Sequence, residues 1–172
     1  MTKKAERFDT GLFIGRFQPF HKGHMRALES ASAECKKLII GIGSSQKMGT
    51  EKNPLSATAR IRIIKAALAG SRLGKKRPRF ITIPDFKSNN DGWFNYINRR
   101  IPKIDVVFSG NRLVKKIFKG HKIAVITLTW YDRGRLSSTN VRRAIRAGRR
   151  WQNLVPKGAI NEISRSFGSA KR

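Results

Sequence analysis

Short apolar segments alternate along this chain with longer segments whose apolar residues recur every three or four positions. The short runs predict buried strands, and the longer segments predict amphipathic helices. The predicted strands are 12–14, 38–42, 80–83, 104–108 and 123–130; the predicted helices are 23–35, a helix after Ser56, 93–100, 112–119, 139–147 and 156–166. This order favours an α/β fold: a Rossmann-like open parallel sheet of about five to six strands with helices on both faces.

The size and composition of the chain suit one such domain. With 172 residues, we expect a single domain over 8–166 and basic, flexible termini at 1–7 and 167–172. Cys35 is the only cysteine, which excludes an intramolecular disulfide and a cysteine metal cluster. No apolar run approaches the ~20 residues that span a bilayer. The sequence therefore predicts a cytoplasmic protein without a membrane segment.

The first informative motif lies where the first strand gives way to the first helix: Gly15-Arg16-Phe17-Gln18-Pro19-Phe20-His21-Lys22-Gly23-His24. Histidines three apart at a helix start can face the same place and donate N–H bonds to phosphate oxygens. Gly23 leaves room for the close approach of a triphosphate, and Arg16 and Lys22 add positive charge. The motif predicts a phosphate-binding turn, although no P-loop sequence is present.

The second motif opens the helix predicted over 139–147. Ser137, Ser138 and Thr139 can cap that helix and leave backbone N–H groups for an anion. Arg142 falls in the first turn, where the helix dipole disfavours a cation unless an anion is nearby. This stretch can also be an ordinary capped helix with a basic face.

The charge leaves a different class of function open. The chain has 38 Lys and Arg against 10 Asp and Glu, a formal net charge of +28. Such a surface attracts polyanions, so a basic nucleic-acid-binding protein, or a nonspecific affinity for nucleic acid, is an alternative. No zinc-finger, KH or RRM string supports it. A zinc site would need more ligands than His121 and Cys35 can add.

Both motifs resemble signatures of the nucleotidylyltransferase superfamily, and the Gly-Arg-Phe-Gln-Pro string resembles the archaeal type of nicotinamide-nucleotide adenylyltransferase. The second motif is similar to the family's Ile-Ser-Ser-Thr-x-x-Arg, with Leu136 in place of Ile. Further similar stretches are Gly43-Ser44-Ser45-Gln46, Asn53-Pro54-Leu55-Ser56-Ala57, Pro84-Asp85 with Asn90 and Trp93, and Ser109-Gly110-Asn111. The family's Glu-Arg-Ile is Ala59-Arg60-Ile61 here, so its carboxylate is missing.

The resemblance implies a role for each matching position. The implied catalytic residues are His21, His24, Arg142 and Arg16. The implied ATP- and phosphate-binding residues are Phe17, Gln18, Lys22, Gly23, Lys52, Gly110, Asn111, Ser137, Ser138 and Thr139. The implied nicotinamide-binding residues are Asp85, Asn90 and Trp93, and no residue is predicted to bind a metal directly.

The activity implied by the resemblance is adenylyl transfer from ATP to nicotinamide mononucleotide (NMN), giving NAD and pyrophosphate. The substrate phosphate attacks in line, without a covalent intermediate. Mg²⁺ or another divalent cation is held mainly through the ATP phosphates, and the family suggests a hexamer. The rival readings are a related transferase of the phosphopantetheine or glycerol-phosphate type, or the nucleic-acid-binding protein.

Overall fold

The computed structural model describes residues 7–87, 89–127, 132 and 134–168. Its strands are β1 (Phe8–Gly15), β2 (Cys35–Gly43), β3 (Arg79–Ile83), β4 (Val106–Phe108) and β5 (Ala124–Ile126). Its α-helices are α1 (Lys22–Glu34), α2 (Ala57–Leu68), α3 (Arg72–Lys75), α4 (Asn90–Arg100), α5 (Arg112–Gly120), α6 (Ser138–Arg146) and α7 (Ile160–Gly168).

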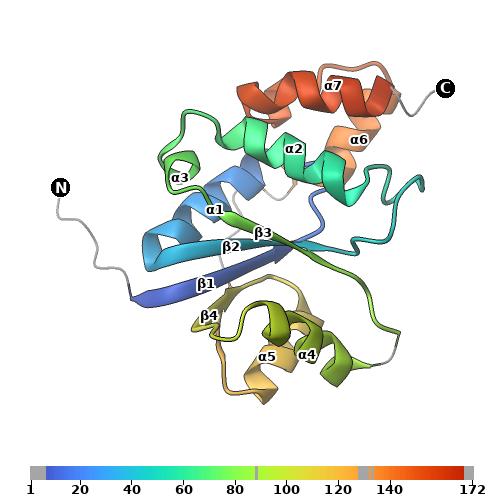
Figure 1. Ribbon diagram of the computed structural model, residues 1–172. Helices are drawn as coiled ribbons and strands as arrows, with labels where there is room; N and C mark the ends of the chain where they lie inside the picture. The colour runs from blue at the N-terminus through green and yellow to red at the C-terminus, as the bar shows by residue number, and fades with distance from the viewer. Residues whose placement is uncertain (1–6, 88, 128–131, 133, 169–172) are drawn as a thin grey trace.

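The five strands form one parallel sheet in the order β3-β2-β1-β4-β5, with β1 at its centre (Figure 1). The chain therefore builds outward from β1 to one edge and then crosses back to build the other edge from β4. Ligands of such sheets bind where the direction of building reverses, at the carboxyl ends of the strands. The predicted α/β class is confirmed, with five strands in the described part of the chain.

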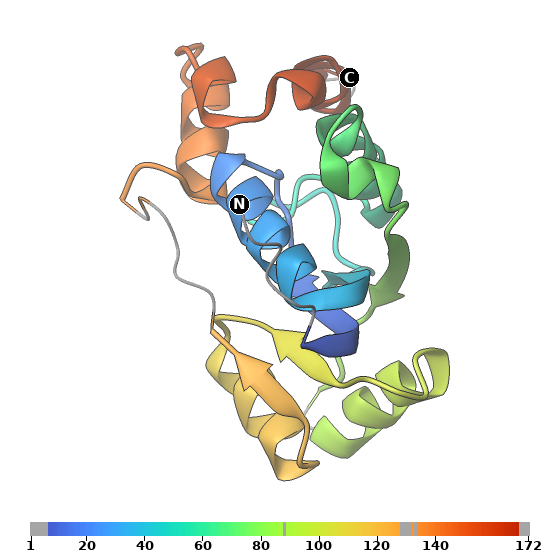
Figure 2. The same cartoon turned by 90° about the vertical axis from the view of Figure 1, so that its left-hand side faces the viewer.

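Each face of the sheet has its own apolar core, because successive strand side chains point to opposite faces. Phe13 packs in one core with α1, α2 and α7, and Leu12 packs in the other with α4 and α5. Figures 1 and 2 show α4 and α5 below the sheet and the remaining helices above it. This period-two division explains how a short strand can be buried on both sides.

Several element boundaries differ from the sequence-based predictions. The helix α4 begins three residues before the predicted Trp93, because the side chain of Asn89 accepts from the Gly92 amide and caps it. The short helix α3, which Ser71 caps, lies outside every predicted helix. A 3-10 turn, Lys157–Ala159, precedes α7 where the α-helix was expected to begin at Pro156.

The predicted strand over 123–130 and both predicted termini are described only in part. β5 covers Ala124–Ile126, and residues 128–130 lie outside the described residues. The helix α7 continues to Gly168, and Phe167 packs against the first core, beyond the predicted domain end at 166. In the described ranges, no helix has the length and apolar character needed to cross a bilayer.

Candidate active site

A cavity of about 570 Å³ lies at the carboxyl ends of the central strands. Most of the predicted site residues line it: Arg16, Phe17, Gln18, His24, Lys52, Asp85, Asn90, Trp93, Gly110, Asn111, Ser138, Thr139 and Arg142. Four predicted residues, His21, Lys22, Gly23 and Ser137, do not line it. The structure thus brings together segments that lie far apart in the sequence.

The turn after β1 is held by an aromatic cluster. Phe17 has a positive φ of 51° and is almost fully buried, a backbone conformation that is unusual for a bulky residue. Its ring folds back over Gly15, where an added Cβ would come within 2.7 Å of the ring. The ring also meets the edge of His24, with centroids 4.9 Å apart. Phe17 therefore packs the turn in addition to lining the cavity.

The two histidines cap α1 with their side chains. The amides of Gly23 and His24 donate to Nδ1 of His21 at 3.1 and 3.4 Å, and the His21 amide donates to Nδ1 of His24 at 3.3 Å. Each Nδ1 is therefore an acceptor, which places the hydrogen of each neutral ring on Nε2. The local sequence thus selects one tautomer for both rings.

Burial keeps both histidines neutral. His21 is 3% exposed and His24 8% exposed, and burial lowers the pKa of His21 to about 4. Burial lowers the pKa of His24 well below its usual range, and the nearby His21 lowers it further. The rings lie 3.7 Å apart between centroids, so two charges there would repel. At neutral pH the pair offers N–H donors and no formal charge.

Gly23 has a different neighbour from the one we expected. A Cβ at this position would lie 3.0 Å from Cε1 and Nδ1 of the His21 ring. The missing side chain makes room for the capping imidazole, so the prediction that Gly23 admits the triphosphate is not needed to explain it. Lys22 is exposed in the first turn of α1, outside the cavity lining.

The helix α6 is fastened to the turn after β1. The Ser138 hydroxyl donates to the Pro19 carbonyl at 2.9 Å, and Nη1 of Arg142 donates to the Gln18 carbonyl at 2.7 Å. Ser137 caps the helix by accepting from the Asn140 amide. These contacts bring the start of α6 beside the start of α1, with His24 and Arg142 lining one cavity.

Arg142 is suited to receive an anion. It is 9% exposed, and burial is the main cause that lowers its pKa, followed by the charges of Arg146 and Arg16. Nη2 donates to Thr139 Oγ1 at 3.3 Å, while Nε is buried without a hydrogen-bond partner in the described part of the chain. A buried donor without a partner is costly, and a bound phosphate oxygen would supply one.

Gln18 and Asn111, which were both predicted to bind ATP, use their side-chain amides for hydrogen bonds within the protein. The Gln18 amide donates to the Leu55 carbonyl at 2.8 Å and accepts from the Leu55 amide at 3.0 Å, which fixes the loop before α2. Oδ1 of Asn111 caps α5 by accepting from the Leu113 amide at 2.8 Å. Gly110 lies beside that cap and lines the cavity. Both polar side chains therefore help to position neighbouring segments.

The helix α4 forms the opposite wall of the cavity. Trp93 is half-buried and meets Phe118 edge to face, with ring centroids 6.0 Å apart. Asn90 is exposed in the first turn of α4 and lines the same cavity. Trp93 thus anchors α4 in the core while one part of it lines the cavity.

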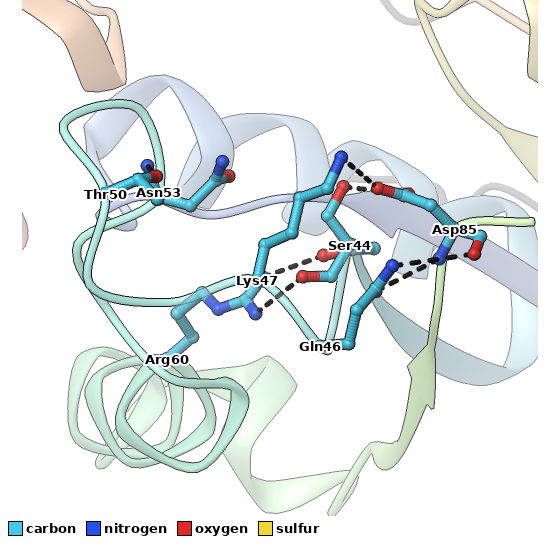
Figure 3. Close-up of polar contacts among 8 residues, drawn as sticks. Ser44, Gln46, Lys47, Thr50, Asn53, Arg60 and Asp85 are labelled. Carbon is cyan, nitrogen blue, oxygen red and sulfur yellow. Dashed lines mark hydrogen bonds and ion pairs between the residues drawn. The ribbon is translucent and has the colours of Figure 1, made fainter. Parts of the chain in front are cut away.

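Asp85 joins two loops at the cavity mouth. Its carboxylate accepts from the Ser44 hydroxyl at 2.9 Å and pairs with Lys47 Nζ at 2.7 Å (Figure 3). The Gln46 side chain bonds both the amide and the carbonyl of Asp85. Asp85 is the only acid among the described residues that line the cavity, and those residues contain no group of three His, Cys, Asp or Glu that could hold a metal.

Arg60 is the important residue that our sequence reasoning left without a role. It is fully buried beneath the cavity, on the apolar stripe of α2 that includes Ile63 and Ile64. An arginine in register with a buried helical stripe is itself a signal, because arginine is rarely buried without specific partners.

The sequence model of the cytidylyltransferase-like family matches residues 12–144 of this chain. The nicotinamide-nucleotide adenylyltransferase of Pyrococcus furiosus is 40% identical over 159 residues, 92% of this chain and 84% of that protein. The chain belongs to the nicotinamide-nucleotide adenylyltransferase family. The nicotinamide-nucleotide adenylyltransferase of Saccharolobus solfataricus is 38% identical over 155 residues, 89% of this chain and 88% of that protein.

Solved structures agree with this family assignment. A bifunctional NMN adenylyltransferase/ADP ribose pyrophosphatase from Francisella tularensis superposes with a TM-score of 0.74 at 25% identity. The match covers 86% of this chain but 44% of that longer chain. The same Francisella protein crystallised with AMP and a Mn ion has a TM-score of 0.73 at 24% identity, a likeness of fold.

Proposed function

We propose that this protein transfers the adenylyl group of ATP to nicotinamide mononucleotide, giving NAD and pyrophosphate. The observation that carries the proposal is the meeting of His24 and Arg142 in one cavity, at the starts of two helices joined by direct hydrogen bonds. The names of the relatives, including the Pyrococcus furiosus protein, support the choice of substrates.

The reaction needs alignment and charge stabilisation more than a strong base. A phosphate oxygen of the mononucleotide forms a bond to the α-phosphorus of ATP as the bond to the bridging oxygen breaks, and pyrophosphate leaves with that electron pair. The nucleophile is already ionised, so no protein group has to remove its proton. His24 would donate an N–H to a phosphate oxygen, and Arg16, Lys52 and Arg142 would offset the negative charge.

The four predicted site residues that do not line the cavity would act indirectly in this scheme. His21 would act by holding His24 and the α1 cap, and Ser137 by capping α6. Gly23 provides space for His21. Lys22 would contribute charge near the start of α1.

A divalent cation fits this cavity only as a partner of the substrates. The one lining acid, Asp85, is engaged by Ser44 and Lys47, and the part of the chain that the structure describes contains no ligand cluster for a metal. Mg²⁺ is suited to binding through phosphate oxygens and water, and when bound it neutralises phosphate charge. The Mn ion in the Francisella protein's crystals is consistent with this use.

The nicotinamide substrate is favoured by the wall opposite Arg142. A pyridinium ring is flat and cationic, and the face of Trp93 can stack on it while Asn90 bonds its carboxamide. Phosphopantetheine and glycerol phosphate have no such ring. The hexamer implied by the family resemblance and a nonspecific affinity for nucleic acid remain predictions.

Three substrate pairs test the proposal. The purified protein, supplied with Mg²⁺, is given ATP with NMN, ATP with phosphopantetheine, or CTP with glycerol phosphate, and pyrophosphate release is measured. We expect turnover with NMN to exceed the other two by at least about 100-fold, because both nicotinamide contacts would be lost. Equal or greater turnover with either rival pair would contradict the assignment.

A matched pair of variants then tests the site. Arg142→Lys should lower kcat/KM for ATP by about 100-fold, because lysine cannot replace the forked guanidinium. Arg143→Lys changes the exposed neighbour on the same helix and should have little effect. Equal effects from the two substitutions would place the phosphates elsewhere.

A further inference from the structure

A buried guanidinium lies directly beneath the cavity and bonds only backbone carbonyls in the described structure. Nη1 of Arg60 donates to the carbonyls of Arg16 at 2.9 Å and Gly43 at 2.8 Å, and Nη2 donates to that of Ser44 at 3.2 Å. Nε donates to the carbonyl of Ser56, the N-cap of its own helix, at 3.2 Å. Figure 3 shows the guanidinium below the segment that carries Ser44.

Three of these carbonyls belong to residues that line the cavity. Arg16 follows β1, and Gly43 and Ser44 are at the carboxyl end of β2. A single rigid fork thus fixes two neighbouring strand ends with respect to each other. It also takes up carbonyl oxygens that carry partial negative charge and would otherwise oppose a phosphate group nearby.

Among the described residues, the charge of Arg60 has no ion-pair partner. None of the ion pairs among the described residues includes it. Burial and then the charge of Arg16 lower the pKa of Arg60 to about 10, while Asp85 raises it, so the group is still a cation at neutral pH. A buried cation without a carboxylate is costly, and an anion in the adjoining cavity would offset that cost.

We propose that Arg60 is a positioning residue for adenylyl transfer: it holds the ends of β1 and β2 in the reactive geometry, and bound triphosphate balances its charge. This inference rests on the proposed function and extends it to a residue that does not line the cavity. Its two parts are separable. The hydrogen-bonding fork sets the alignment that affects kcat, and the charge contributes to the affinity for ATP.

Two substitutions separate the fork from the charge. Arg60→Lys keeps a cation but cannot reach several carbonyls at once, and Arg60→Met removes both properties. In assays with ATP and NMN, we expect Arg60→Lys to lower kcat by about 100-fold, since small misalignments have effects of that size. KM for ATP should change less than about threefold in Arg60→Lys and rise at least about tenfold in Arg60→Met. KM for NMN should change little in both.

Arg62→Met is the matched control. It removes an exposed arginine on the same helix whose partner is Glu162, so its kinetics should equal those of the wild type. Circular dichroism and thermal melting establish the fold of every variant. The proposal is overturned if Arg60→Lys keeps wild-type kcat, if Arg60→Lys and Arg60→Met raise KM for ATP equally, or if both variants fail to fold, because Arg60 would then serve the fold alone.

A binding measurement keeps this test apart from the test of the proposed function. The rise in melting temperature with MgATP is measured for the wild type and for each variant without any second substrate. A wild-type protein that binds ATP but makes no NAD would contradict the proposed function, while the loss of the ATP-dependent rise in Arg60→Met would still support the inference. An undiminished rise in that variant would overturn it.

Discussion

The two walls of the cavity are built in different ways. The α1/α6 wall is formed by His24, Ser138 and Arg142, with His21 behind it as the cap of α1. Its contacts with the backbone of the turn after β1 are buried for Arg142 and partly buried for Ser138. The α4 wall, formed by Asp85, Asn90 and Trp93, is joined to the loop after β2 through the exposed contacts of Asp85. Buried bonds fix one geometry, whereas exposed ion pairs contribute little and are screened by salt.

This difference matches the demands of the proposed reaction. The α-phosphorus of ATP must be held in line with the attacking oxygen within a fraction of an ångström, so its wall gains from rigid, dry contacts. The nicotinamide ring takes no part in the chemistry and needs only a surface and a hydrogen bond. Changes in the α1/α6 wall should therefore affect kcat, and changes in the α4 wall should affect KM for NMN.

His24→Ala should produce the largest effect. Removing one preorganised donor from a phosphoryl-transfer site lowers kcat by about 100- to 1,000-fold. His121→Ala is the control, because His121 lies at the end of α5, stacked on Phe94, outside the cavity lining. Steady-state assays with ATP and NMN decide the matter: near-normal kcat in His24→Ala would refute the difference between the walls.

Acid should weaken the α1/α6 wall next. The pKa of His21 is about 4 in the folded protein and near 6.5 when unfolded, so the unfolded chain binds more protons between these values. The contribution of this pKa shift to the free energy of unfolding is thus fully present above pH 6.5 and is lost as the pH falls towards 4. The whole shift corresponds to about 3 kcal/mol. Urea unfolding across this range measures it.

His21→Asn sharpens that test. Asparagine can also cap a helix but does not titrate here, so the variant should keep a folded α1 and show a shallower loss of stability between pH 6.5 and 4. The remaining slope would include the contribution of His24, whose pKa is also lowered. A slope as steep as that of the wild type would show that His21 does not carry this pH dependence.

Trp93→Ala should have a smaller and more selective effect. Loss of a stacked ring beneath a pyridinium is expected to raise KM for NMN by about tenfold. KM for ATP should be unchanged, and Trp93→Phe should retain most of the affinity because an aromatic face remains. If both KM values rose together in Trp93→Ala, the residue would be an anchor of the α4 core only.

Lys47→Met should have the smallest effect. It removes an ion pair with Asp85 in which both side chains are largely exposed, so stability should fall by less than about 1 kcal/mol. KM for NMN should change by less than about fivefold, with the difference decreasing as salt is added. A large fall in kcat would mean that the α4 wall, like the α1/α6 wall, determines the alignment of the reacting groups.

The sequence predicted those parts of the fold and site that local chemistry determines. Alternating apolar runs identified the strands, and the strings around His24 and Arg142 identified segments that line one cavity. The sequence could not show that the side-chain amide of Gln18 forms hydrogen bonds with the Leu55 backbone, because the two residues are 37 positions apart and meet only in the folded chain. The burial of Arg60 could be read from its place on the apolar stripe of α2, but its carbonyl partners could not, because they come from the ends of two strands.

The hydrogen bonds between α6 and the turn after β1 have a consequence for the synthesis and degradation of the protein in the cell. Ser138 and Pro19 are 119 positions apart, and Arg142 and Gln18 are 124 apart. A chain still emerging from the ribosome, or one clipped ahead of α6, lacks Ser138 and Arg142 and therefore one side of the proposed phosphate site. Occupancy by ATP would then mark finished molecules, and a plentiful ligand would protect them from unfolding and degradation.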